Sequence, residues 1–190
     1  MALGIHVSNL EADAIAITSA ADPGFDSEIR ALFQGDSEEL LKLKPFLVII
    51  SNGSTRTMVA YTLTWVLKQP GGSRITHVQS KYPDAVADAF PVRGNEIRPG
   101  EQKIDPMSIE LDCGRWTGEA TGPFYLKQFA NWFNEYADAT ELHICFDAVI
   151  FDDGDLLGPN EARLEQDFLT YLNSKEDCYR SILKAPPANP

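Results

Sequence analysis

Residues 45–67 read PFLVIISNGSTRTMVAYTLTWVL and carry the clearest indication of the fold. β-Branched and aromatic side chains, which favour strands, make up most of both halves of this stretch. Asn52-Gly53 separates the halves and is a strong signal for a tight turn between antiparallel strands. The stretch therefore predicts a β-hairpin, with strands at about residues 46–51 and 58–67.

Two predicted strands have an apolar face, because side chains alternate between the two sides of a strand. In the strand at 58–67 this face consists of Val59, Tyr61, Leu63, Trp65 and Leu67. A strand at 141–151 alternates more clearly, and its expected core face consists of Leu142, Ile144, Phe146, Ala148 and Ile150. The opposite face of that strand carries His143, Cys145 and Asp147.

The remaining elements are predicted from caps, turns and helical periodicity. Asp26 or Ser27 can cap a short helix, and Ser37 can cap a second one that ends before Pro45. Further strands are expected at about residues 75–80 and 102–111, the first of them after the turn signal Pro70-Gly71-Gly72. Helices are expected near 124–137 and from the cap Asn160 onward.

These elements predict one compact domain that is mainly β with added α. Strands separated by turns favour an antiparallel β-sandwich over an α/β fold. We expect residues 1–44 to form an N-terminal extension with short helices. Residues 45–158 would form the sandwich with its inserted helix, and 159–190 would form a C-terminal helix and a frayed tail.

The segment LVIISNGSTRTMVAYTLTW, with the later turn Arg98-Pro99-Gly100-Glu101, resembles bacterial immunoglobulin-like β-sandwich modules. In those modules an apolar strand that ends in Asn and small polar residues precedes a second strand. The resemblance covers about residues 45–111 and implies only the fold, since such modules share no catalytic residues. The paired cysteines of antibody-type domains are missing, because the strand at 46–51 offers no partner for Cys145.

Composition excludes several kinds of partner. The formal net charge is −12, and the basic residues are scattered singly, so we expect no binding to nucleic acid. No apolar stretch approaches the roughly 20 residues of a membrane span, so we expect no membrane insertion. The start of the chain lacks the pattern of a signal peptide, which favours the cytoplasm unless such a peptide has been removed.

Familiar enzyme signatures are missing, including GxGxxG, the P-loop, HExxH and GxSxG. His143, Cys145 and Asp147 are nevertheless candidates for a metal site or for a thiol nucleophile with its base. A zinc site would need one or two further ligands, for which Cys113 and His77 are the candidates. The alternative is a half-polar sheet face with a buried thiol and a hydrogen-bonded histidine.

Asp152, Asp153 and Asp155 could supply oxygen ligands to calcium in an extracellular module, although their spacing does not fit an EF-hand. The simpler interpretation is a two-residue hairpin turn at Asp153-Gly154, followed by a short returning strand. Asn52-Gly53-Ser54 also matches the glycosylation acceptor motif, but a turn between two strands is already a sufficient explanation of these residues.

The predicted helix near 124–137 has aromatic side chains around most of its circumference, and this excess indicates an interaction surface. The expected contact residues are Phe124, Tyr125, Trp132 and Tyr136. We therefore expect a non-enzymatic protein-interaction or binding module without a cofactor, whose partner is another protein or a second copy of the chain. A metal-dependent or thiol enzyme that uses His143, Cys145 and Asp147 is the alternative.

Overall fold

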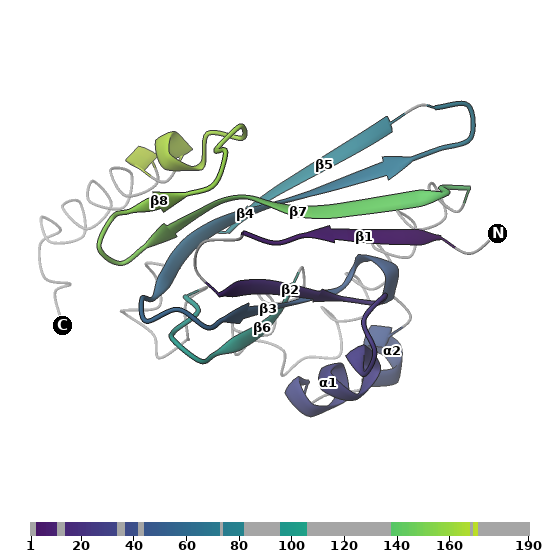
Figure 1. Cartoon of the computed structure of the whole chain (residues 1–190), viewed down its shortest axis with the longest axis horizontal. Coiled ribbons are helices and arrows are strands. Elements are labelled where there is room, and N and C mark those ends of the chain that lie inside the picture. The colour runs from purple at the N-terminus through teal and green to yellow at the C-terminus, as the bar shows by residue number, and fades with distance from the viewer. Residues whose placement is uncertain are drawn as a thin grey trace, which may run out of the picture.

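Two β-sheets with short helices beside them form the described part of the chain, which is mainly β (Figure 1). The computed structural model describes residues 3–10, 14–33, 37–41, 44–72, 74–81, 96–105, 138–167 and 169–170. The predicted helix near 124–137 and the end of the predicted C-terminal helix lie outside these residues.

The larger sheet has the strand order β1-β7-β4-β5, with β8 also paired to β7. Its strands are β1 (Gly4–Ser8), β4 (Met58–Lys68), β5 (Arg74–Lys81), β7 (Glu141–Phe151) and β8 (Leu156–Leu157). β4, β5, β7 and β8 pair antiparallel, whereas β1 runs parallel to β7. The prediction of an antiparallel sheet is therefore wrong for β1, and the sheet is mixed.

One edge of β7 is shared by two strands. Residues 141–145 of β7 pair with β1, and residues 149–150 pair with β8. The other edge of β7 pairs with β4 along nearly its whole length. β7 is therefore a central strand, and its second edge is completed by β1 from the beginning of the chain and by β8, which follows β7 directly.

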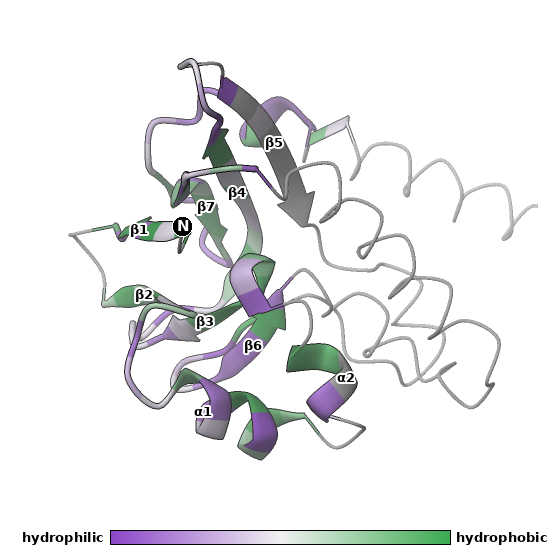
Figure 2. Ribbon diagram, turned by 90° about the vertical axis from the view of Figure 1, so that its right-hand side faces the viewer, coloured by the Kyte–Doolittle hydropathy of each residue, from purple (hydrophilic) through white to green (hydrophobic). Residues whose placement is uncertain are grey.

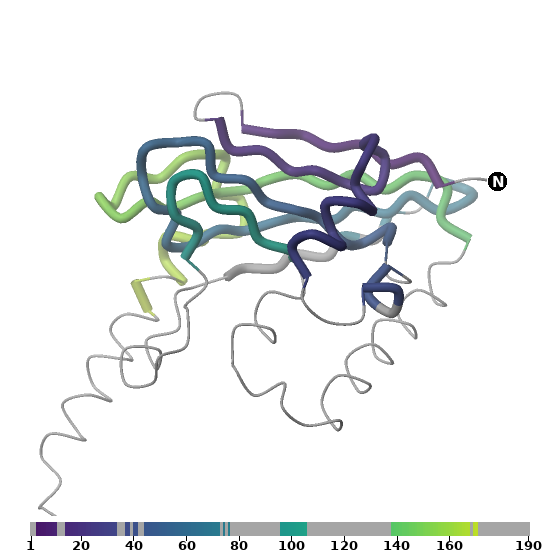
Figure 3. The backbone as a smooth tube through the Cα atoms, turned by 90° about the horizontal axis from the view of Figure 1, so that it is seen from below, coloured from purple at the N-terminus to yellow at the C-terminus, as the bar shows by residue number. Residues whose placement is uncertain are grey.

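The smaller sheet has the order β2-β3-β6 and is antiparallel throughout. Its strands are β2 (Ile15–Ser19), β3 (Val48–Asn52) and β6 (Gln102–Asp105). β2 and β1 lie side by side where the two sheets meet (Figure 3). The sequence pattern predicts only short helices before residue 45 and does not reveal either of these strands.

The predicted hairpin around Asn52-Gly53 is wrong, because β3 and β4 belong to different sheets. A two-residue hairpin of the expected type needs positive φ at both central residues, and neither Asn52 nor Gly53 has one. Gly53 instead allows the backbone at Ala14 to pack closely against it, since a β-carbon at Gly53 would lie 2.8 Å from the Ala14 carbonyl oxygen. The connection carries the chain from one sheet to the other.

The main core lies between the two sheets, and a second core lies under the helices. Side chains from β2 and β3 meet those of β4 and β7 in the main cluster, which includes Tyr61, Leu63, Trp65 and Phe146. The other face of the smaller sheet is covered by α1 (Phe25–Leu32) and α2 (Ser37–Leu41) (Figure 2). A 3₁₀ turn (Lys44–Phe46) leads from there into β3.

Bulges in β4 and β7 change which side chains reach the main core. The pairing skips Val59 in β4 and Asp147 in β7. Each extra residue moves the side chains beyond it to the opposite face of the strand. Met58 therefore replaces the expected Val59 in the core, and Val149 and Phe151 replace the expected Ala148 and Ile150.

Ala148 and Ile150 lie on the outer face of the larger sheet, together with Ala60 and Leu164. Leu164 begins the helical residues 164–167. The predicted cap Asn160 does not begin this helix, since its backbone is left-handed, with φ 57°. The predicted caps of α1 are also wrong, because Gly24 occupies the cap position without a side-chain hydrogen bond.

Candidate functional site

On the exposed half of the outer face of the larger sheet, residues of neighbouring strands form rows in which most side chains are polar. One row runs across four strands through Gly4, Glu141, Lys68 and Arg74. The next row runs through His6, His143, Val66 and Thr76. Strand register therefore fixes which of these side chains are neighbours, and the backbone beneath them is a hydrogen-bonded sheet.

His6, Glu141 and His143 form a cluster on this face. The rings of His6 and His143 are stacked, with centroids 4.7 Å apart and planes inclined by 24°. Glu141 Oε2 lies 3.2 Å from His143 Nε2. The three potential ligand atoms all lie within 4.8 Å of one another, and among the described residues this is the group of His, Cys, Asp and Glu side chains that could hold a metal.

Lys68 orients the carboxylate of this cluster. Its Nζ donates to Glu141 Oε1 at 2.8 Å, which leaves Oε2 directed toward His143. The hydrogen bond from Lys68, and then the one from His143, hold the pKa of Glu141 below its ordinary value. The carboxylate is therefore ionised and available as an acceptor or ligand at neutral pH.

Cys145 follows on the same face but is not part of the cluster. It is half-buried, and its Sγ lies 3.8 Å from the carbonyl oxygen of Thr64. Burial raises the pKa of the Cys145 thiol, and the charges of Asp147 and Glu161 raise it further. A thiol in these surroundings is a poor nucleophile, because the reactive thiolate is disfavoured.

Asp147 has a structural position at the bulge of β7 and is 6% exposed. Its two carboxylate oxygens accept the backbone N–H groups of Glu161 and Ala162, each at 2.9 Å. Its own carbonyl oxygen accepts the N–H of Asn160. Asp147 therefore fixes the segment that leads to Leu164, and the predicted grouping of His143 with Cys145 and Asp147 is replaced by the cluster with His6 and Glu141.

His6 and Glu141 are not among the site residues predicted from sequence. A signal for His6 was present, since Ile5-His6-Val7 and Leu142-His143-Ile144 are matching triplets of one histidine between two apolar side chains. Such triplets suit strands with one buried face. Their pairing was not visible, because it required β1 to lie parallel to a strand far along the chain.

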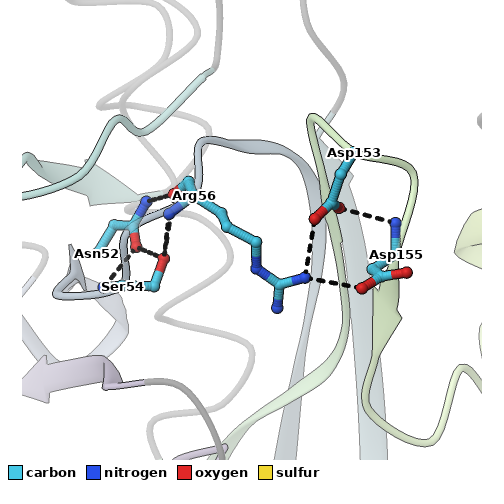
Figure 4. A network of polar contacts seen from close by, with 5 residues as sticks. All are labelled: Asn52, Ser54, Arg56, Asp153 and Asp155. Atoms are coloured by element: carbon cyan, nitrogen blue, oxygen red, sulfur yellow. Dashed lines mark hydrogen bonds and ion pairs between the residues drawn. The ribbon is translucent and has the colours of Figure 1, made fainter.

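Asp153 and Asp155 are bound by Arg56 from the segment between β3 and β4 (Figure 4). Arg56 Nη1 lies 3.2 Å from Asp153 Oδ2 and 2.9 Å from Asp155 Oδ2, and its guanidinium stacks 3.7 Å from the centre of the Phe151 ring. Asp153 Oδ1 accepts the Asp155 N–H at 3.0 Å. These contacts give both predicted calcium ligands a role in fixing the turn, and Asp152 is exposed.

The turn itself is a three-residue loop and not the expected two-residue one. Phe151 accepts from the N–H of Gly154 and donates to the carbonyl of Asp155. Gly154 has φ 88°, which is typical of the left-handed position in such a loop. The predicted returning strand is confirmed as β8.

Asn52 is 1% exposed and its side chain is fully engaged. Nδ2 donates to the carbonyl of Ile97 at 2.7 Å. It also donates to the carbonyl of Arg56 at 2.7 Å, while Oδ1 accepts from the Ser54 hydroxyl at 2.7 Å and from the Ser54 N–H at 3.1 Å (Figure 4). A glycosylation acceptor must be accessible, so this geometry supports the structural interpretation.

Other predicted site residues lie outside the described part of the chain. They are the candidate ligand Cys113, the side chain of His77, and the aromatic residues Phe124, Tyr125, Trp132 and Tyr136. Among the described residues, no helix combines the length and apolar character needed to cross a membrane.

Comparisons with known proteins add little to this geometry. No protein-family model and no curated protein matches the chain. A solved structure of a hypothetical protein from Peptoclostridium difficile 630 aligns with 64% of this chain and 81% of its own, at 13% identity and a TM-score of 0.24. A likeness at this level carries no argument about fold or function.

Proposed function

We propose that this chain is a non-enzymatic protein-interaction module with an immunoglobulin-like β-sandwich. Its contact surface is the exposed half of the outer face of the larger sheet, across β1, β7, β4 and β5. The observation that carries the proposal is the contrast between buried and exposed polar groups. Cys145 and Asp147 serve the internal structure, while His6, His143, Arg74 and Thr76 are presented to solvent on a rigid sheet.

The strand order supports the immunoglobulin-like part of the proposal. The smaller sheet, β2-β3-β6, corresponds to strands A, B and E of such a sandwich. The order β7-β4-β5 corresponds to strands F, C and C′, and β8 corresponds to strand G. Trp65, 2% exposed on β4, stands on the strand that carries the core tryptophan in these domains.

The test is to place bulky charges on the proposed surface and to measure binding. Thr64→Arg/Thr76→Arg alters the face at β4 and β5 and leaves the three residues of the cluster unchanged. Ser27→Arg adds the same kind of charge to exposed α1 and serves as the control. A partner captured from cells would be purified and titrated against the unmodified chain, the double variant and the control. Sedimentation of the chain alone would reveal self-association.

We expect the double variant to weaken binding by about tenfold or more, because charge repulsion and lost contact act at the centre of the interface. Ser27→Arg should bind as the unmodified chain does. Equal affinity for all three proteins would refute this surface. Saturable turnover of a substrate that Cys145→Ala abolishes would refute the non-enzymatic role.

A further inference from the structure

We infer that His6, Glu141 and His143 form a binding site for a divalent transition metal, of which Zn²⁺ is the best match. This inference goes beyond the proposed protein-interaction role and does not depend on it. It rests on the convergence of two imidazoles and one carboxylate from two neighbouring strands.

The ligand chemistry suits zinc. Imidazole nitrogen and carboxylate oxygen are ordinary zinc ligands, and two histidines with one glutamate are a known set of three protein ligands. Donor atoms around a tetrahedral zinc lie about 3.3 Å apart, as follows from bonds of about 2.0–2.1 Å. The atoms here lie within 4.8 Å of one another, so small rotations of the two exposed histidines and the half-buried Glu141 bring them into range.

The backbone favours convergence of these three side chains. His6 and His143 are direct partners in the parallel pairing of β1 and β7, and Glu141 lies on the same face two positions before His143. The partner of Glu141 is Gly4, which adds no side chain to the space between His6 and the carboxylate. A β-carbon at Gly4 would lie 3.6 Å from His6 Nε2 and 3.8 Å from Glu141 Cγ.

The neighbouring Lys68 leaves one carboxylate oxygen of Glu141 available to a metal ion. Lys68 occupies Glu141 Oε1, while Oε2 already points at His143 Nε2. A metal ion would replace this contact between Oε2 and Nε2 and would bind the neighbouring imidazole as well. Three protein ligands leave a coordination position for water or for a donor atom of a bound partner.

A metal ion at this site would join β1 to β7. β1 is short, and its described strand pairing is with β7. Ligands from both strands would make the metal a cross-link between the beginning of the chain and the central strand. Zinc binding should therefore slow the hydrogen exchange of β1 amides more than that of β5 amides.

The test is a zinc titration of the full chain after removal of metal with a chelator. We expect saturable binding of one zinc ion per chain, measured by calorimetry. Co²⁺ bound in place of Zn²⁺ would report the ligands through its visible absorption spectrum. His6→Ala and His143→Ala should each weaken binding by about tenfold or more, and Glu141→Gln should weaken it less. Circular dichroism would verify that each variant is folded, as expected for exposed positions.

Three matched controls identify the site. His77→Ala removes the remaining histidine of the chain, Asp153→Asn removes a carboxylate of the Arg56 network, and Cys113→Ser/Cys145→Ser/Cys178→Ser removes the thiols. All three should retain one-to-one binding. The inference is overturned if zinc does not saturate, if the control variants lose binding, or if His6→Ala and His143→Ala bind as tightly as the unmodified chain.

Discussion

The two halves of β7 differ in their surroundings although they belong to one continuous strand. In the first half, buried Leu142 and Ile144 alternate with exposed His143 and half-buried Cys145. In the second half, every residue from Asp147 to Phe151 is buried. The bulge at Asp147 separates the halves, and residues 158–164 cover the second one.

This difference shows how a single strand can serve both as core and as display surface. The first half has β1 on its edge and an open outer face, which carries the candidate metal site. The second half has β8 on its edge and Leu164 on its outer face. The carboxylate of Asp147 links the bulge to the covering segment, so one residue sets the boundary.

The largest expected effect comes from placing the same charge in each half. Ile150→Lys should reduce the free energy of unfolding by about 4 kcal/mol or more, because an unpaired ammonium would be buried beside Ala60 and Leu164. His143→Lys should change it by about 0.5 kcal/mol or less, because that position is exposed. Urea unfolding with a chelator present would measure the free energy of unfolding of both variants. Similar losses in the two variants would contradict the difference between the two halves of β7.

Removing the boundary residue should have the next largest effect. Asp147→Ala leaves two backbone N–H groups without their acceptor and should cost about 3 kcal/mol. Asp147→Asn keeps one acceptor oxygen and should cost less. Hydrogen exchange at Glu161 and Ala162 should accelerate in both variants, and unchanged exchange would show that Asp147 does not hold this segment.

Two glycines provide a smaller, matched test of the covering segment. A β-carbon at Gly158 would lie 2.5 Å from the Asp147 carbonyl oxygen, whereas one at Gly154 would meet nothing within 4 Å. Both glycines have positive φ, so Gly154→Ala should cost about 1 kcal/mol and Gly158→Ala about 2 kcal/mol or more. Thermal unfolding would distinguish the two variants. Equal losses of stability would mean that the close approach of Gly158 to β7 is unimportant.

The smallest effect concerns acid stability at the turn beyond β7. The hydrogen bond from the Asp155 N–H, with a further contribution from Arg56, holds the pKa of Asp153 below its ordinary value of 3.8. Because the folded-state pKa is the lower one, the stabilisation is present above 3.8 and is lost as the pH falls through the folded-state pKa.

Unfolding of the unmodified chain and of Asp153→Asn should therefore be compared between neutral and strongly acidic pH. The unmodified chain should be the more stable at neutral pH, and the difference should shrink in strong acid. A difference that is constant with pH would show that ionisation of Asp153 does not contribute.

The strands with regular alternation of apolar and polar residues could be predicted from sequence. The bulges that change which of their side chains face the main core could not. Residues 148–151 are Ala-Val-Ile-Phe, all apolar, so nothing in them shows which pair faces the main core. The bulge residue Asp147 forms hydrogen bonds with residues 160–162, which lie beyond β7 in the chain. Periodicity within β7 contains no information about them.

The candidate site was predicted in part, since His143 was identified and its neighbours were not. Cys145 and Asp147 were grouped with it because alternate residues share a strand face, and the bulge ends that alternation at Asp147. His6 belongs to a five-residue strand whose partner lies far along the chain. The Asn52-Gly53 signal misled for a similar reason, because local turn preference does not show whether two strands share a sheet.

The parallel pairing of β1 with β7 also has a consequence for how the chain folds. β1 is synthesised early, but its strand partner β7 is made only after most of the described elements. Contacts between residues so distant in sequence close slowly, because a long loop must be ordered first. The larger sheet is therefore expected to acquire its first strand late in folding, and until then the edge of β7 beside the histidine is open to pairing with other chains.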